Sequence, residues 1–338
     1  MDLQCDTCKT AYKIQDGLIP VGKRVRFTCK RCRTAEAALH PQRPTTAPSA
    51  STARSLPVPQ GISMRERILA GIKDLPAMPQ VITEIQAQMA GAEINTRKIC
   101  GLIEADPAIT TKVLRSANSA YYGRSGRVAT ITVALNLIGL KGLLEVVAFV
   151  GAQRLLSGRL PGYGYEAEDL WRHSIAVACG SKLLALSKDP GISDTAYLAG
   201  LIHDVGRIIM DRLVLEMKAD IANFMESEQK TFLDAETRFF GLNHAKVAAE
   251  VCTKWKFPSE MANAIGWHHD PSKSNQNLLA YILHMADHLA TMIGISYDSD
   301  DVLSQVEEGT MDFLGLKQTD LGDLVSRITE AVDRASQL

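Results

Sequence analysis

From Ser63 to the end of the chain, apolar residues recur at spacings of three and four, and alternating apolar and polar runs are nearly absent. Such spacing places apolar side chains on one face of a helix, whereas a half-buried strand alternates. The pattern therefore predicts an all-α domain of many helices. The clearest helices are expected over residues 107–118, 140–156, 168–186, 195–213, 215–228, 231–239, 244–255, 259–267, 278–293 and 320–335.

Two other patterns precede the helical one. In residues 1–33 the apolar side chains of Tyr12, Ile14, Val25 and Phe27 alternate with polar ones, as in short strands. Residues 34–62 are rich in Pro, Ala, Ser and Thr and contain almost no bulky apolar residue. Such a segment buries too little surface to offset its ordering entropy. We therefore expect a small β module over residues 1–33 and a flexible, disordered linker over residues 34–62.

The β module also carries metal-ligand chemistry. Its four cysteines, Cys5, Cys8, Cys29 and Cys32, form a C-x2-C-x20-C-x2-C pattern. Two such pairs supply four thiolates to a tetrahedral zinc ion, and a segment this short has too little core to fold without one. The pattern predicts a zinc ribbon, with a redox-active or free thiol set as the alternative. The segment resembles the MJ0042-type finger found at the N-termini of bacterial regulatory proteins.

Charge and hydropathy narrow the classes of partner. With 37 basic and 38 acidic residues the formal net charge is -1, which argues against a general nucleic-acid coat or a polybasic membrane binder. The finger itself carries a local charge of about +5. A solvated basic face is the simpler interpretation of it, so we do not expect nucleic-acid binding. No apolar run reaches about 18 residues and the N-terminus lacks signal-peptide features, so we expect a cytoplasmic protein without membrane contact.

The helical region contains an inventory of hard metal ligands. The segment LAGLIHDVGRIIM inserts His203 and Asp204 into an apolar run, which is costly unless a cation compensates the carboxylate. Each ligand candidate alone also fits a core role, such as a histidine bonded to the backbone or Asp204 in a salt bridge. Together they predict one or two divalent ions such as iron, manganese or zinc. The candidates are His173, His203, Asp204, His244, His268, His269 and Asp287.

The order of these residues resembles a known family. His173, the pair His203-Asp204 and Asp287 are similar to the H…HD…D pattern of the HD superfamily of metal-dependent phosphohydrolases. His244 and His268-His269 resemble the further ligands of its two-metal members. The stretches LPAMPQV, IEADPAITTKVLRSANSAYYG, TVALNLIGLKGL, LAGLIHDVGRIIM, NHAKVAAEVCTKWKFP and AIGWHHD resemble the HDOD domain, a relative of HD-GYP domains. The resemblance implies an HDOD domain over residues 63–293, with parts 63–160 and 161–293, followed by a C-terminal helical extension over 294–338.

The resemblance also implies a function. HDOD domains are regulatory output modules that act through protein or ligand interactions, so we expect a signal-transduction protein with protein partners, a possible nucleotide ligand and a retained metal site. Arg207 stands where HD-GYP enzymes carry a lysine, and HHDPSKSN lacks the GYP signature. Whether the chain is an enzyme stays open. The alternative is a metal-dependent phosphohydrolase or phosphodiesterase for a nucleotide or cyclic dinucleotide, in which Asp204 acts at the ions and Arg207 or Lys246 neutralises substrate charge.

Overall fold

The computed structural model of the chain forms two compact units, Met1–Gln60 and Gly61–Leu338. The predicted zinc ribbon is in the first unit, but Cys5, Cys8, Cys29 and Cys32 lie outside the described residues. The ribbon therefore stays a prediction. The structure describes residues 2–4, 11–13, 24–28, 35–39, 63–75, 80–89, 95–118, 128–295 and 306–336.

The described parts of the first unit are two antiparallel strand pairs. β1 (Asp2–Gln4) pairs with β2 (Ala11–Lys13), and β3 (Arg24–Thr28) pairs with β4 (Ala35–Leu39). β4 lies inside the segment predicted to be a disordered linker. Its sequence AEAAL has no strand pattern of its own, and it is held by backbone pairing along the whole of β3 instead. The strand region therefore extends beyond residue 33, and residues 40–62 lie outside the described residues.

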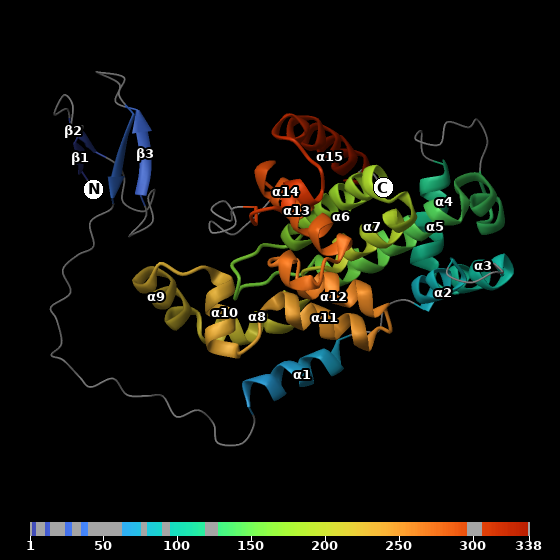
Figure 1. Ribbon diagram of the computed structural model, residues 1–338, viewed down its shortest axis with the longest axis horizontal. Helices are drawn as coiled ribbons and strands as arrows, with labels where there is room; N and C mark the ends of the chain where they lie inside the picture. Colours follow the sequence, from blue (N-terminus) through green and yellow to red (C-terminus); the bar gives the residue numbers. More distant parts are fainter. Residues whose placement is uncertain are drawn as a thin grey trace. The chain divides into compact units, whose positions relative to one another are not determined.

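The second unit is helical throughout its described residues, apart from an isolated bridge between Leu160 and Tyr165, as the sequence pattern predicts (Figure 1). Short 3-10 helices join some of the longer ones. The α-helices are α1 (Met64–Asp74), α2 (Gln80–Met89), α3 (Thr96–Glu104), α4 (Pro107–Asn118), α5 (Ile131–Leu156), α6 (Asp169–Lys188), α7 (Ser193–Ile202), α8 (Gly206–Glu216), α9 (Lys218–Glu228), α10 (Phe232–Phe240), α11 (His244–Lys254), α12 (Ser259–Gly266), α13 (Leu278–Met292), α14 (Thr310–Phe313) and α15 (Leu321–Ser336).

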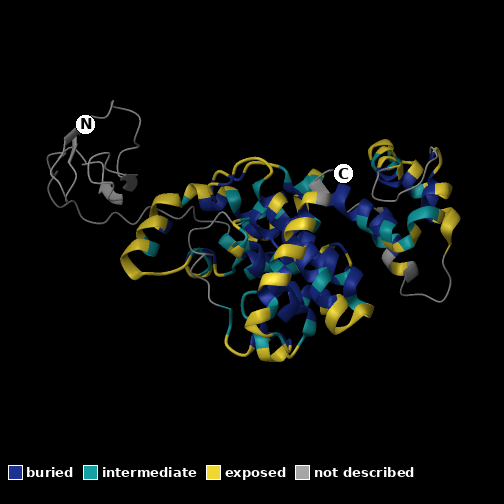
Figure 2. Cartoon of the chain, turned by 90° about the horizontal axis from the view of Figure 1, so that it is seen from above, coloured by how far each residue is buried: buried dark blue, intermediate teal, exposed yellow. Residues whose placement is uncertain are grey.

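Helix α6 is the centre of the packing. It contacts α7, α13 and α15, while α8 contacts α11 and α11 contacts α12. Figure 2 shows buried residues concentrated where these helices meet. The segment expected to be a C-terminal extension belongs to this core, because Leu324 and Ile328 of α15 are buried in it. Helices from both parts of the expected HDOD domain thus surround one interior.

Two glycines let the central helices approach closely. A Cβ on Gly200 of α7 would lie 2.6 Å from the Cα of Ala178 in α6. A Cβ on Gly206 would lie 2.0 Å from the carbonyl oxygen of His244. The start of α8 therefore abuts the start of α11, and backbone atoms occupy the space beside Gly206.

The single helix predicted over residues 195–213 is wrong, because the chain forms α7 and α8 with a tight turn between them. In this turn the amides of Val205 and Arg207 donate to the carbonyls three residues earlier, at 3.1 and 3.0 Å. The apolar spacing continues across the turn because both helices bury their faces in one core, so periodicity does not reveal the break. The turn consists of His203, Asp204 and Val205.

Helix α5 is, among the described helices, the one long and apolar enough by length and composition to cross a membrane. Half of its apolar window is buried inside the protein, and it contacts α4 and α7. Gly139 interrupts it with φ 73° and ψ 171°, after which the helix resumes. These contacts make α5 a core helix of the second unit.

Candidate metal centre

The seven ligand candidates come from separate elements and lie together in the second unit. His173 is on α6, His203 and Asp204 are in the turn between α7 and α8, and Asp287 is on α13. His244 begins α11 after the N-cap Asn243, as expected. His268 and His269 occupy the turn that follows α12. Their ligand atoms form three overlapping groups, within each of which all atoms lie within 4.8 Å of one another.

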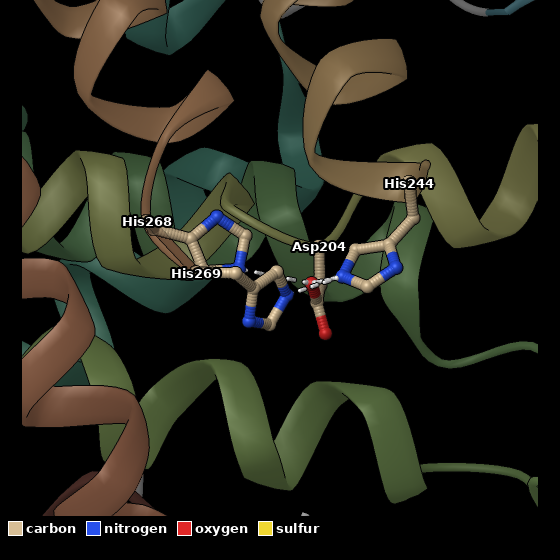
Figure 3. Close-up of side chains that lie close together, drawn as sticks. All are labelled: Asp204, His244, His268 and His269. Carbon is tan, nitrogen blue, oxygen red and sulfur yellow. Dashed lines mark hydrogen bonds and ion pairs between the residues drawn. The ribbon is translucent and has the colours of Figure 1, made fainter. Parts of the chain in front are cut away.

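The first group surrounds Asp204 (Figure 3). The Oδ1 atom of Asp204 lies 3.2 Å from Nε2 of His244 and 3.9 Å from Nε2 of His268. The Nε2 atoms of His244 and His269 are 2.8 Å apart. Figure 3 shows the three imidazole rings and the carboxylate converging on one small region. This group offers one carboxylate and three imidazole donors to an ion.

The other groups extend the cluster toward α6 and α13. The Oδ1 atom of Asp287 lies 3.0 Å from Nε2 of His173 and 3.9 Å from Nε2 of His203. The Nε2 atom of His203 is also 3.6 Å from Oδ1 of Asp204. His203 therefore stands between the two carboxylates. The arrangement has donors for one ion or for two neighbouring ions.

Three donor atoms in this cluster have no hydrogen-bond partner. They are Nε2 of His203, Nε2 of His268 and Oδ1 of Asp204, all buried. A buried polar atom without a partner costs about 1–3 kcal/mol. Since the three atoms belong to overlapping groups, one cation would compensate several of them. The donors present therefore fit a divalent metal.

The other ring nitrogens have fixed backbone partners. Nδ1 of His203 lies 2.8 Å from the carbonyl oxygen of Gly200, and Nδ1 of His268 lies 2.7 Å from that of Ile265. In each pair Nδ1–H donates, which leaves the Nε2 lone pair for a metal. His203 and His268 therefore each form the backbone hydrogen bond expected of a core histidine, through Nδ1. That bond does not explain their Nε2 atoms, which have no partner.

Charges within the cluster set its protonation. Burial lowers the pKa of His268 to about 3 and also lowers that of His203, so both are neutral and able to bind metal. Burial alone would raise the pKa of Asp204, but Arg207 and the nearby histidines hold it well below its ordinary value. Burial opposes protonation of His173 as well, yet Asp287 raises the pKa of His173 to about 9.

His244 is oriented by a buried pair that the sequence interpretation missed. The side chain of Glu236 on α10 is fully buried, and its Oε2 accepts from Nδ1 and from the backbone amide of His244 at 2.7 and 2.8 Å. The hydroxyl of Tyr163 donates to Oε1 of Glu236 at 2.6 Å. Despite burial and Arg207, Glu236 and Asp204 raise the pKa of His244 to about 9. The available signal was a glutamate four residues before Phe240, on the apolar face of a short helix.

Of the two cations predicted to neutralise a substrate, Arg207 contacts the cluster through Asp204, whereas Lys246 lines a separate cavity. Arg207 is 4% exposed; its Nε donates to Oδ2 of Asp204 at 2.9 Å and its Nη1 to the hydroxyl of Tyr165 at 2.7 Å. The ammonium of Lys246 lies over the ring of Trp267. Burial lowers the pKa of Lys246 to about 8. Lys246 lines a cavity whose lining contains none of the seven ligand candidates.

Solved structures share this fold. An HDOD domain protein of unknown function from Geobacter sulfurreducens has a TM-score of 0.65 at 23% identity, over 80% of this chain and 96% of that one. A protein of Shewanella amazonensis SB2B, provisionally named a phosphohydrolase, has a TM-score of 0.61 at 22% identity, over 82% and 100%. A protein of Marinobacter aquaeolei VT8, provisionally named a signal transduction protein, has a TM-score of 0.60 at 21% identity, over 81% and 65%. At these identities the likeness concerns the fold.

Sequence comparison gives the family. An uncharacterized protein of Treponema pallidum (strain Nichols) is 28% identical over 202 residues, which are 59% of this chain and 38% of that protein. The chain thus spans well under half of that relative's length. The family model of the HDOD domain matches residues 75–271, more than half of the chain and six of the seven ligand candidates. The chain therefore belongs to the HDOD domain family.

Proposed function

We propose that this protein is a metal-binding signalling module in which a divalent ion fixes the arrangement of α6, α11, α13 and the turns beside them, and a protein partner reads that arrangement. The observation that carries the proposal is the set of three buried donor atoms without partners, on His203, Asp204 and His268. A cation at these atoms links segments that are far apart in the sequence. Metal binding would then contribute directly to the stability of this core.

The ligand roles follow from the geometry. Asp204 and Asp287 would supply carboxylate oxygens, and the five histidines would supply Nε2 atoms, because those atoms face the cluster. An ion held this way supplies positive charge and Lewis acidity. Iron, manganese and zinc suit a mixed set of imidazole and carboxylate donors. The predicted zinc of the finger would be a separate ion.

A regulatory role explains the contacts of Arg207 and Lys246 better than a hydrolytic role does. Phosphoryl chemistry needs positive charge aimed at the substrate's oxygens. The guanidinium of Arg207 instead donates to Asp204 and to Tyr165, and Lys246 lies in the lining of a separate cavity. We therefore propose that this protein acts through protein or ligand interactions. We further propose that it does so in the cytoplasm, with a signalling protein as partner.

Metal content tests the proposal. The purified full chain is compared by elemental analysis with a His203→Ala, Asp204→Ala double variant, and the difference excludes any zinc held by the finger. We expect the full chain to carry about one or two more equivalents of metal per chain, as the donor count allows. Asp270→Asn, close to the cluster but outside it, should keep the metal. Equal metal contents in the full chain and the double variant would contradict the proposal.

Hydrolysis is the second candidate, and one observation favours it. The side chain of Asp287 is 20% exposed and His269 is half-buried, so one side of the cluster reaches the surface. A phosphate ester could approach the ions from this side. Metal-loaded protein is assayed with bis-p-nitrophenyl phosphate and with cyclic dinucleotides. Turnover that disappears in His203→Ala would establish the hydrolase; its absence at full metal occupancy leaves the signalling role.

A further inference from the structure

A cavity of about 640 Å³ lies on the side of the second unit covered by α1, within the roughly 300–1,000 Å³ range of small-molecule sites. Its walls come from α1, α10, α11 and the segment from Trp267 to Lys273. None of the seven metal-ligand candidates lines it. The cavity is therefore distinct from the metal centre.

Helix α1 forms one wall of this cavity. The helix ends before the segment 75–271 that the HDOD family model matches. In Figure 1 it runs beneath α11, and it contacts α8 and α11. The cavity is thus lined on one side by a helix that lies outside the family match.

The position of α1 is fixed from both ends. The Lys254 ammonium donates to the carbonyl oxygens of Ile72, Lys73 and Leu75 at 2.6, 2.8 and 2.9 Å. Near the start of the helix, Arg67 pairs with Glu216 at 2.7 Å. The Lys254 ammonium thereby satisfies three carbonyl oxygens at the C-terminal end of α1. The anchors lie beside the cavity, so α1 spans it without filling it.

The lining combines an apolar wall with two cations that form no ion pair among the described residues, the exposed Arg65 and the half-buried Lys246. Ile68, Leu69 and Ile72 face the cavity from α1, and Leu233 and Val247 face it from α10 and α11. Lys246 projects from α11 with its ammonium over Trp267, and no carboxylate of the described residues lies within ion-pair distance of that ammonium.

The acidic residues of the lining have other contacts or lie at its edge. Asp270 pairs with Lys273 at 3.4 Å, and Asp234 accepts from the amide of Thr231 at 3.1 Å. Glu250 is exposed. Asp270 attracts the Lys246 ammonium without forming a direct ion pair with it. A negative group at Lys246 therefore meets a half-buried cation that has no direct ion pair, while an apolar body meets the leucine and isoleucine side chains.

We propose that this cavity binds a small organic anion, whose apolar or aromatic body lies between α1 and α11 and whose carboxylate or phosphate pairs with Lys246. A charge-assisted hydrogen bond to a partly buried ammonium is stronger than a neutral one, and the apolar wall supplies area to bury. The binding site is independent of the proposed metal function. A ligand bound in the cavity would nevertheless contact residues next to the candidate metal centre. Trp267 directly precedes His268, and Lys246 lies two residues after His244.

The test uses 8-anilinonaphthalene-1-sulfonate, an aromatic anion whose fluorescence rises in an apolar site, titrated into the full chain. We expect saturable binding at one site per chain. Lys246→Met should weaken it at least about tenfold, the weight of one charge-assisted hydrogen bond. Leu69→Trp should remove it by filling the cavity. The uncharged analogue N-phenyl-1-naphthylamine should bind at least about tenfold more weakly than the sulfonate.

Matched controls separate the cavity from general effects. Lys73→Met removes an exposed lysine of α1 outside the lining, and Leu215→Trp makes the same enlargement at an exposed leucine of α8. Both variants should bind like the wild type. Displacement of the dye by 1-naphthoate or by 1-naphthyl phosphate would tell which anionic group the site prefers. Unchanged binding in Lys246→Met or Leu69→Trp, or displacement by neither competitor, would overturn the proposal; metal content decides the other proposal separately.

Discussion

At the scale of single residues, the geometry of the His/Asp cluster depends on side chains that are not among the seven ligand candidates. Glu236 holds His244 by two hydrogen bonds and is itself held by Tyr163. A neighbour of this kind fixes the ring orientation and the tautomer of a metal-binding histidine. The seven ligand candidates, which the structure brings together, could be named from residue types, since imidazoles and carboxylates in apolar helices are costly without a cation. Glu236 could not, because one acidic residue in a short helix is ordinarily at the surface.

Replacing Glu236 tests this positioning role. Glu236→Gln keeps the shape and removes the charge that holds Nδ1–H of His244. We expect metal affinity to fall by about 10–100-fold, the usual effect of losing such a partner. Competition with a chelating dye measures it. Glu226→Gln, at an exposed position on α9, should leave the affinity unchanged. An unaltered affinity in Glu236→Gln would mean that His244 needs no such support.

The histidines also predict a dependence on pH. In the metal-free protein the pKa of His173 and that of His244 are raised from 6.5 to about 9. A raised pKa in the folded state stabilises the fold below pH 6.5, and this contribution is lost as the pH rises through about 9. Metal-free protein should therefore lose thermal stability between these values, whereas metal affinity should rise because fewer protons must leave. Thermal melts and metal titrations across this range measure both trends; parallel trends would contradict the assignment.

At the scale of elements, the turn between α7 and α8 explains what sequence periodicity could and could not predict. The spacing of apolar residues identified helices on both sides, because each buries one face. It missed the break at His203–Val205, since the core is continuous across it. Strand β4 was not predicted for a related reason: its backbone pairing with the preceding strand β3 overrides a weak local pattern. Where the site lies, tertiary contacts decide the local structure.

Gly206 tests the meeting of α8 and α11. In Gly206→Ala the new Cβ would lie 2.0 Å from the carbonyl oxygen of His244, so one helix start has to move. We expect destabilisation of roughly 1–3 kcal/mol, as for overpacked sites, together with weaker metal binding because His244 shifts. Urea unfolding and metal titration measure these effects. Gly101→Ala on α3, where nothing lies within 4 Å of the added Cβ, should be neutral or stabilising. Equal behaviour of the two variants would contradict this close contact.

At the scale of the whole molecule, the proposed metal site predicts that metal binding and folding of the second unit are coupled. The ligand candidates come from α6, α11, α13 and two turns, and buried residues of all three helices belong to the hydrophobic core. An ion that binds only the folded chain stabilises it by about 2.7 kcal/mol at a concentration of 100 times its Kd. Metal in excess should therefore raise the melting temperature by roughly 5–10 °C for a unit of this size.

This shift should belong to the second unit. Removing residues 1–60, the first of the two units, would remove any zinc bound by the predicted ribbon and should preserve the shift. The His203→Ala, Asp204→Ala double variant should lose it, because two of the three unpartnered donor atoms are gone. Scanning calorimetry of all three proteins, with added manganese or zinc and with a chelator, measures the difference. A shift that disappears with residues 1–60 and survives in the double variant would assign the stabilising metal to the ribbon, and the core cluster would then be a packing arrangement without an ion.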